Sequence, residues 1–584
     1  MLAVTIFVTT GSNPDASNDV STLRRLPQHN GVFNREVELS GKRRWTWLLG
    51  VVALAAGFSM MVAAYGVAAN KTSKAPKQTY KKVGTLRAIL DTIDFLDPQQ
   101  AYTGQSWWAM WNVYETLLTY KHVDGPAGYT LVPGLAQSMP KISSNGRVYK
   151  FTLRKGLKYS NGKKLQASDF KWAIKRGFLA TGQGVGFYTD IAGAKAYAAH
   201  PTKGGNISGI VVNNKKRTII IKLTKPRGDF LTILALLFAA PVPSSTSTQI
   251  LNGKIPGTGP YRFSSFDANR GFTMVRNSFF TPTKYIPRGN PDKVVVSFVP
   301  DANSATQRVI NGQADYSNGA IPPDRIANAQ KKGHLVLRDT ANTYYFWMNI
   351  REAPFNKLKV RQAVNYAIDR GAMNRIVWGG LGKATQNVLP PTYPSYTKLK
   401  LYSHNVTKAK QLINQAGVKG AKVTVWTRDV SDARDAAQYY TSILNTIGLN
   451  AKLNILPRAT YYSTVGNVAT HAQTGWARWL EDYPHPLDWF DVLLNGNRIT
   501  NTDNNNYAWY SNAKTNKEIE GLKKAQTLTA AVNKRWATVE KQIMQQAPWA
   551  PWSNRVFPEF FTKKMGCIHI QRLYGIDLTR LCRK

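Results

Sequence analysis

The stretch of sequence that decides the fold is Asn145-Gly-Arg-Val-Tyr-Lys-Phe-Thr-Leu-Arg-Lys-Gly-Leu-Lys-Tyr-Ser-Asn-Gly162. From Val148 to Leu153, large apolar side chains alternate with other residues, which is the period of a half-buried β-strand. An Asn-Gly pair lies at each end of the stretch, and this dipeptide is typical of tight hairpin turns. Either Ser168 or Asp169 is suited to begin the next helix as its N-cap. The stretch therefore predicts a strand between two turns, followed by a helix.

A second informative stretch is Gly475-Trp-Ala-Arg-Trp-Leu-Glu-Asp-Tyr-Pro-His-Pro-Leu-Asp-Trp-Phe-Asp-Val-Leu-Leu-Asn-Gly496. In its second half, apolar side chains recur at the spacing of one helical face, at Leu487, Phe490 and Leu494. Pro486 suits the first helical turn, and Gly496 suits a left-handed cap at the helix end. The pattern predicts a loop that contains Asp482 and leads into a helix that ends at Gly496.

These two stretches resemble the family 5 solute receptors of bacterial ABC importers, which bind peptides. The first stretch is similar to the signature segment of that family. The second matches the family's Trp-x-x-Asp-Tyr-x-x-Pro passage at Trp479-Leu-Glu-Asp-Tyr-Pro-His-Pro486. The resemblance extends from about residue 79 to the end of the chain. It implies a mixed α/β, two-lobed fold of the periplasmic-binding-protein type (class II, cluster C), with an extra subdomain in the N-terminal lobe.

The resemblance and the composition together suggest a division of the chain. We expect a disordered N-terminal tail at 1–44, a signal peptide or signal-anchor helix at 45–69, a linker at 70–78, lobe I at 79–296, lobe II at 297–551, and a return segment at 552–584 that completes lobe I. Closure is expected to bend hinge strands near residues 294–299 and 548–551.

The segment 45–69 is uncharged and apolar and follows Lys42-Arg43-Arg44, as an export signal does. Small residues at 67–69 suit cleavage before Asn70, but about 20 apolar residues also suffice to span a bilayer uncut. Both alternatives place the bulk of the chain outside the cytoplasm, in the cell envelope.

The chain is strongly basic, with a formal net charge of +44. Residues 1–69 contain six Lys or Arg and four Asp or Glu, so the basicity belongs to the body of the protein. The basic residues are spread along the chain without a zinc-finger or helix-turn-helix pattern, which argues against specific binding of nucleic acid. Diffuse positive charge favours contact with anionic cell-wall polymers.

The resemblance assigns a role to Asp482, because in this family the Asp of the passage pairs with the α-ammonium group of a peptide. A charge in a closed cleft has to be paired and hydrogen-bonded, and a carboxylate on a loop meets that need. A solvated turn residue or a helix cap is the alternative interpretation of Asp482. The other candidate ligand-binding residues are Trp476, Trp479, Tyr483, Thr103, Gly104, Gly257, Thr258 and Gly259.

Two features of these candidates have ordinary structural explanations as well. In the resembled family the segment Gly257-Thr-Gly259 borders the cleft, where small residues let backbone amides approach a ligand, but tight-turn geometry accounts for it equally. Trp107, Trp111, Tyr114 and Leu118 fall at helical spacing, which predicts a helix with its apolar stripe in the core.

The sequence contains no pattern typical of an enzyme, a cofactor site or a metal site. The eight histidines lack metal-ligand spacing, and no Gly-x-Ser-x-Gly elbow is present. Two cysteines, Cys567 and Cys582, lie close together; in an exported protein they suit a disulfide, with two separate buried thiols as the alternative. We therefore expect no catalysis, no nickel and no haem.

The interpretation that the sequence and the resemblance favour is the substrate-binding component of an ABC importer. It captures short peptides between its lobes as a monomer and delivers them to a membrane permease that cytosolic ATPases drive. Two alternatives stay open from the sequence: the same fold with another solute such as an oligosaccharide or opine, and a wall-bound adhesin or chaperone-like protein that uses the basic surface.

Overall fold

The structure is a computed structural model that describes residues 81–143, 145–319 and 321–584. The chain divides into two units, residues 1–77 and 78–584, and all described residues belong to the second. The predicted tail, signal or anchor segment and linker therefore lie outside the described residues. Among the described helices, none is both long and apolar enough to cross a membrane.

A mixed sheet of twelve strands organises the described residues, in the order β16-β15-β17-β13-β18-β11-β1-β10-β9-β8, with β12 and β14 also paired to β18. One group of its strands belongs to lobe I: β1 (Thr85–Leu90), β8 (Tyr261–Asp267), β9 (Gly271–Arg276), β10 (Lys293–Phe298) and β11 (Tyr316–Ser317). A second group belongs to lobe II: β13 (Asn342–Met348), β14 (Gly382–Ala384), β15 (Lys422–Arg428), β16 (Asn450–Leu456) and β17 (Thr474–Leu480). The mixed α/β, two-lobed fold expected from the sequence is confirmed.

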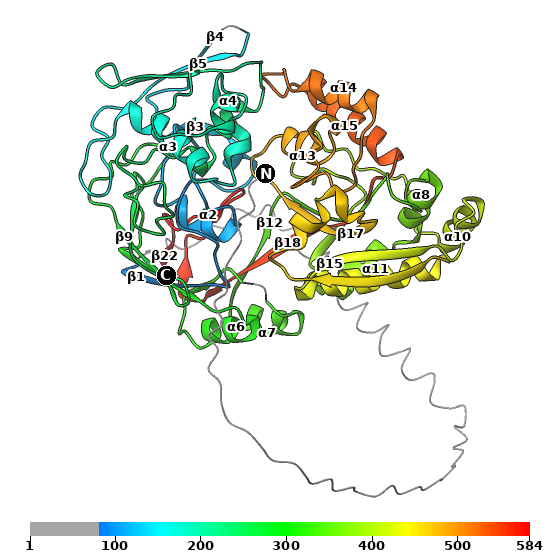
Figure 1. The fold of residues 1–584 in the computed structure, drawn as a ribbon. Helices are drawn as coiled ribbons and strands as arrows, with labels where there is room; N and C mark the ends of the chain where they lie inside the picture. The colour runs from blue at the N-terminus through cyan, green and yellow to red at the C-terminus, as the bar shows by residue number, and fades with distance from the viewer. Residues whose placement is uncertain (1–80, 144, 320) are drawn as a thin grey trace, which may run out of the picture. The chain divides into compact units, whose positions relative to one another are not determined.

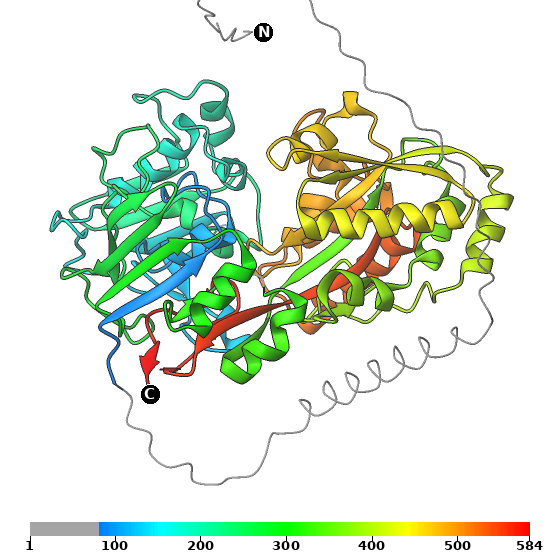
Figure 2. The same ribbon diagram turned by 90° about the horizontal axis from the view of Figure 1, so that it is seen from below.

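Two long strands, β12 (Gly333–Asp339) and β18 (Trp549–Thr562), connect the groups (Figures 1 and 2). The first part of β18 pairs with β13, and its last part pairs with β12 and β11. Asn342 lies where the partner changes: its side chain donates to the Arg555 carbonyl (2.8 Å) and accepts from the Arg555 amide (2.7 Å). A side-chain amide thus replaces regular ladder hydrogen bonds at this point.

The segment at residues 294–299, where a crossing between the lobes is expected, has a neighbouring strand on each side. That segment is β10, which pairs along its length with β1 in parallel and with β9 in antiparallel register. The helices that follow, α6 (Ala302–Ile310) and α7 (Ile326–Lys332), pack in one buried cluster with Ile89 of β1 and Phe560 of β18. These contacts place residues 297–332 with lobe I, and we propose that the chain passes into lobe II between β12 and β13.

Lobe I also carries a separate antiparallel sheet, in the order β4-β5-β7-β6. Its strands and neighbouring helices are β4 (Lys141–Ser143), β5 (Val148–Thr152), β6 (Ile210–Asn213), β7 (Thr218–Lys222), α3 (Ala167–Leu179) and α4 (Ala194–Ala199). Asn145 and Gly146 have φ angles of 52° and 82°, the left-handed values that a tight hairpin needs. The strand and first turn predicted from the opening stretch are therefore confirmed, and this sheet is the extra subdomain.

The start of α3 differs from the prediction. Its N-cap is Gln166, and Asp169 is the third helical residue, whose carboxylate accepts from the Gln166 amide at 2.9 Å. The carboxylate therefore closes a capping box three residues inside the helix, a role that sequence inspection mistook for the N-cap itself.

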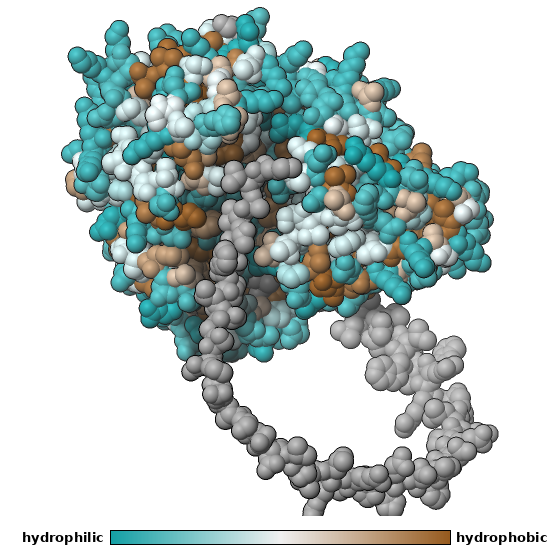
Figure 3. Space-filling view, viewed as in Figure 1, coloured by the Kyte–Doolittle hydropathy of each residue, from teal (hydrophilic) through white to brown (hydrophobic). Residues whose placement is uncertain are grey.

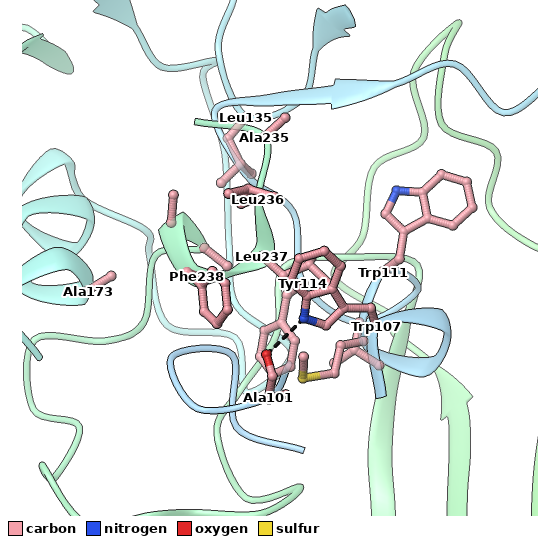
Figure 4. Close-up of a cluster of buried hydrophobic side chains, with 14 of the residues drawn as sticks. Ala101, Trp107, Trp111, Tyr114, Leu135, Ala173, Ala235, Leu236, Leu237 and Phe238 are labelled. Atoms are coloured by element: carbon pink, nitrogen blue, oxygen red, sulfur yellow. Dashed lines mark hydrogen bonds between the residues drawn. The ribbon is translucent and has the colours of Figure 1, made fainter. Parts of the chain in front are cut away.

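The aromatic stripe of lobe I is core, as expected, but it does not form one helix. The helix α2 (Gly104–Met110) ends before Trp111, and Leu118 already belongs to β2 (Leu118–Tyr120), which pairs with β3 (Leu131–Pro133). Trp107 donates its indole N–H to the Ala101 carbonyl at 2.8 Å and packs among buried side chains that include Phe238 (Figure 4). Burial, and not helical periodicity, explains the spacing of these residues.

In lobe II, β13 has every residue buried. Tyr345 and Trp347 enter one hydrophobic cluster, while Tyr344, Phe346 and Met348 enter another, so the strand is covered on both faces. The covering helices are α8 (Leu358–Ala367), α9 (Arg370–Trp378), α10 (Val406–Gln415), α11 (Ser431–Thr446), α12 (Tyr461–Val465), α13 (Leu487–Leu493), α14 (Ala513–Leu522) and α15 (Ala530–Gln545).

The C-terminal segment returns to lobe I. Cys567 and Cys582 are joined by a disulfide, and β19 (Met565–Gly566) pairs with β22 (Cys582–Arg583) beside it. Two short strands, β20 (Ile570–Gln571) and β21 (Gly575–Ile576), pair within the loop that the disulfide closes. The alternative of two separate thiols does not hold in this structure.

Candidate functional site

The loop between β17 and α13 contains the candidate residues, and it is buried. Glu481 continues the ladder by donating its amide to the Ala341 carbonyl (3.1 Å). Asp488, in the first turn of α13, accepts from the Asp482 amide (3.0 Å) and from the Trp479 indole N–H (3.1 Å). These bonds hold the loop in one conformation on rigid elements.

The end of α13 differs from the expectation. The helix stops at Leu493 with Leu494 as its C-cap. Gly496 begins a short 3-10 turn and has no left-handed φ. A glycine suits position 496 for a different reason, because a Cβ there would lie 2.0 Å from the Ser511 hydroxyl oxygen.

Asp482 is 8% exposed and accepts a hydrogen bond from the Tyr102 hydroxyl at 2.6 Å. Tyr102 belongs to lobe I, so this bond joins the lobes. Burial raises the pKa of Asp482 to about 7, and the hydrogen bond from Tyr102 opposes that rise. Within residues 81–143, 145–319 and 321–584, Asp482 has no ion-pair partner.

Two further carboxyl groups lie beside Asp482. Glu481 accepts from the Tyr393 hydroxyl at 2.9 Å and from the Tyr129 hydroxyl of lobe I. Burial raises the pKa of Glu481 to about 7, and burial together with repulsion from Asp482 raises the pKa of Asp488 well above its usual range. We call Glu481, Asp482 and Asp488 the acidic cluster: it is buried between the lobes, and tyrosine hydroxyls, not cations, are its direct side-chain partners from lobe I.

The three aromatic candidates differ in position. Trp476 and Tyr483 are fully buried, and Tyr483 donates its hydroxyl to Asp229 of lobe I at 2.7 Å. Trp479 keeps partial exposure next to the acidic cluster. Among these three, Trp479 is therefore the residue best placed to contact a ligand, while Tyr483 connects the lobes.

The remaining candidates lie in lobe I. A Cβ on Gly257 would lie 2.1 Å from the Val113 carbonyl oxygen, and Thr258 accepts from the Glu115 amide at 3.0 Å. A Cβ on Gly259 would likewise approach the backbone, at 2.8 Å from the Asn112 carbonyl oxygen. The glycines are thus needed for close packing of two chain segments, and neither has the left-handed φ of a glycine-requiring turn.

Thr103 and Gly104 begin α2. Thr103 is the N-cap, and its amide and hydroxyl donate to Asp94 at 3.0 and 2.9 Å. Asp94 also accepts from the Tyr102 amide at 2.6 Å, so this network holds Tyr102 in place against Asp482. Gly104 is exposed, with open space where a Cβ would be. Thr103 therefore positions Tyr102.

Sequence reasoning missed a second group, which is basic. Arg428 ends β15, is 6% exposed and lies over the Trp476 ring at 4.6 Å, and its Nε has no hydrogen-bond partner among the described residues. Burial lowers the pKa of Arg428, and repulsion from Arg478 on β17 contributes. An arginine at the carboxyl end of a parallel strand, just before the helix α11, is the signal that could have indicated it.

Metal binding has no support in the described part of the chain, where no three His, Cys, Asp or Glu side chains are grouped to hold an ion. The acidic cluster instead has the features of a site for an organic cation: it is buried, carries unpaired carboxyl groups and is lined by aromatic side chains. Together with the two-lobed fold, this defines the class of a solute-binding protein whose ligand lies between two lobes.

The particular family follows from comparison. Residues 130–501 match the family model described as "Bacterial extracellular solute-binding proteins, family 5 Middle", and the chain belongs to this family. It is 26% identical over 494 residues to Heme-binding protein A of Haemophilus influenzae, covering 80% of this chain and 85% of that protein. It is 25% identical over 389 residues to the Dipeptide-binding protein of Escherichia coli K12, covering 62% and 70%.

Among solved structures, the chain is similar to Clavulanic acid biosynthesis oligopeptide binding protein 2, with a TM-score of 0.80 and 23% identity over 86% of this chain and 96% of that one. This likeness supports the fold. The family match confirms the resemblance recognised from the two stretches of sequence.

Proposed function

We propose that this protein is the extracytoplasmic substrate-binding component of an ABC importer and that its ligand is a short peptide. The observation that carries the proposal is the state of Asp482, a buried carboxylate without a cationic partner among the described residues. A peptide α-ammonium group is the right size and charge to pair with it, and the pairing would offset the cost of burying both charges. Names of relatives that bind dipeptides and oligopeptides support this choice of ligand.

The basic residues Arg428 and Arg478 supply a place for the C-terminal carboxylate of the peptide. Arg478 precedes Asp482 by four residues, so their backbones are at most about 13 Å apart on an extended strand. Arg478 lies near enough to Arg428 for its positive charge to contribute to lowering the pKa of Arg428. A peptide of about three residues spans such a distance, with its ammonium at Asp482 and its carboxylate at the pair formed by Arg478 and Arg428.

Closure of the lobes is proposed to bend the two crossing segments, between β12 and β13 and within β18 near residues 553–556. There the pairing of β18 passes from β13 to β12. The closed form would then dock on a membrane permease driven by cytosolic ATPases, acting as a monomer in the cell envelope. Contact of the basic surface with anionic cell-wall polymers belongs to the same proposal, and catalysis does not.

Calorimetric titration of the full chain with tripeptides tests the proposal. Free peptides should bind the wild type, N-acetylated peptides should not, and Asp482→Asn should abolish binding. Asp324→Asn, which changes an exposed carboxylate in lobe I, is the matched control and should bind as the wild type does. Binding that survives both acetylation and Asp482→Asn would overturn the role of Asp482.

The carboxylate end has its own test. Peptides that are amidated at the C-terminus should bind the wild type about tenfold more weakly, the effect of losing one charge-assisted interaction of ~1.4 kcal/mol. In Arg428→Gln, the same amidation should lower the peptide affinity only slightly, because an arginine that pairs with the carboxylate is already absent. If the variant still discriminates between acid and amide peptides, another residue binds the carboxylate.

A further inference from the structure

A cavity of about 200 Å³ lies in the extra subdomain, and no residue of the acidic cluster lines it. Its polar lining comes from three separate segments of chain: the loop after β5, the loop before α3, and the turn between β6 and β7. The polar and charged residues that line it are Arg154, Lys164, Gln166, Asn214, Lys215 and Arg217. Four of these six are cations, and no Asp or Glu is among the residues that line the cavity.

The fold holds these segments together before any ligand binds. Asn214 accepts from the Ser168 amide at 3.0 Å and donates to the Gln166 side chain at 2.8 Å, which ties the β6–β7 turn to the start of α3. Arg217 has a φ of 55° in that turn, and its guanidinium donates to the Leu153 carbonyl. The cavity is therefore preformed, because its walls are joined by hydrogen bonds.

The charge around this cavity is concentrated, although the chain as a whole is diffusely basic. Residues 153–167 and 213–217 contain eight Lys or Arg and no Asp or Glu. Lys164, Lys215 and Arg217 form no ion pair in the described ranges of the chain. The nearby Asp169 is buried and accepts from Gln166 and from Tyr159, so it belongs to the helix start and not to the lining.

We propose that this cavity binds a phosphate group, either free inorganic phosphate or the headgroup of an anionic phospholipid. Guanidinium and ammonium groups that converge from several sides match the several oxygens of a phosphate. A bound anion would also relieve the repulsion among four like charges, which is present when the cavity is empty. The site is independent of the peptide site, and neither proposal rests on the other.

The face in Figure 3 is mainly hydrophilic, and its hydrophobic residues form small scattered groups. The cavity itself is lined by four cations and two side-chain amides, so binding to an anionic surface through it would rely on charge and hydrogen bonds. This predicts a strong dependence on salt, because exposed charges are screened over about 10 Å at 0.1 M ionic strength.

The test is calorimetric titration of the full chain with inorganic phosphate in a chloride buffer. The wild type should show saturable binding, and the double substitution Lys164→Gln and Lys215→Gln should weaken it about tenfold. These two side chains form no hydrogen bond that the fold needs. The control is Lys534→Gln and Lys541→Gln on the exposed face of α15, which removes the same charge and should leave affinity within about twofold.

Two further arms complete the experiment. Lys164→Arg with Lys215→Arg should retain phosphate binding, and an unchanged circular dichroism spectrum and urea unfolding midpoint in all variants would show that the fold is intact. Co-sedimentation with phosphatidylglycerol vesicles then distinguishes the sources: retention that the Gln double variant loses indicates a lipid headgroup, and phosphate binding without retention indicates free phosphate. The proposal is overturned if neither ligand binds, or if both Gln double variants weaken binding equally.

Discussion

Two groups of buried carboxylates lie on either side of Tyr483. They differ in whether an arginine of the protein pairs with them. On the lobe I side, Asp229 accepts two bonds from Arg227, one of them at 2.7 Å, and Arg227 also pairs with Asp190 at 2.9 Å. On the lobe II side, Asp482 receives a hydrogen bond from a tyrosine and pairs with no cation of the described residues. Both carboxylates are buried, so the difference between them comes from their partners.

The pKa values follow that difference. Burial acts to raise the pKa of Asp229, but the charge and hydrogen bonds of Arg227 outweigh it and lower the pKa to about 2. Burial raises the pKa of Asp482 to about 7, and no opposite charge reverses the effect. A carboxylate that stabilises the fold brings its own cation, whereas a carboxylate that binds a ligand leaves that place open.

The largest expected effect is a contrast in stability. Asp229→Asn should lower the free energy of unfolding by about 3 kcal/mol, because it leaves the buried Arg227 with one carboxylate instead of two. Asp482→Asn should leave stability at pH 8 unchanged or higher, because it removes a buried charge that pairs with no cation in the described ranges of the chain. Urea unfolding of both variants and the wild type measures this contrast. Equal losses would mean that Asp482 is a structural residue.

Much of this site could be predicted from sequence, for a definite reason. The passage from Trp479 to Pro486 is contiguous, so its loop, its helix and the position of Asp482 could be read locally. The strand and turn near Asn145 were predicted correctly because periodicity and turn chemistry are also local. The start of α3 and the end of α13 were misjudged by a few residues, since several polar or small residues near each end suit a cap.

What the sequence could not indicate depends on contacts between distant segments. Tyr102 meets Asp482 across 380 positions, and no local pattern marks that tyrosine. The placement of β10 inside lobe I depends on its pairing with β1 and β9, whereas its apolar run alone fits a crossing strand equally well. Gly257 looks like a ligand-binding glycine until Val113 is seen to pack against it.

The second expected effect is on the pH dependence of stability without ligand. The raised pKa of Asp482 means that the folded protein holds a proton that the unfolded chain has released between about pH 4 and pH 7. Stability should therefore fall as pH rises through this window, by at most ~1.4 kcal/mol per pH unit for this group. The slope should be smaller in Asp482→Asn, as urea midpoints at several pH values would show. A parallel shift at all pH values would contradict the assignment.

Asp229 should act in the opposite direction and at lower pH. Its pKa is lowered to about 2, so the stability that it contributes is complete above about pH 4 and is lost as pH falls toward 2. In Asp229→Asn this acid-dependent part should be absent, while the dependence between pH 4 and 7 should remain. The two variants thus divide the pH profile between the two carboxylate groups.

Peptide affinity should increase with pH, whereas the stability without ligand should decrease. An ammonium group pairs with the ionised form of Asp482, so affinity should rise with pH, by up to about tenfold per unit below pH 7. Binding should release a proton to the buffer near pH 6.5, which titrations in buffers of different ionisation enthalpy detect. An affinity that does not change from pH 5.5 to 7.5 would mean that the ligand does not use the ionised form of this carboxylate.

The smallest effect isolates the hydrogen bond between the lobes. Tyr102→Phe removes the hydroxyl that donates to Asp482 at 2.6 Å, which should raise the pKa of Asp482 further and leave less of it ionised at neutral pH. Peptide affinity should fall about fivefold, corresponding to ~1 kcal/mol for one hydrogen bond. Tyr120→Phe is the matched control, because the buried Tyr120 hydroxyl has no hydrogen-bond partner in the described residues and its loss should change affinity little. If both substitutions weaken binding equally, the effect is general packing in lobe I, and the hydroxyl of Tyr102 has no special part in holding the Asp482 carboxylate in position for the ligand.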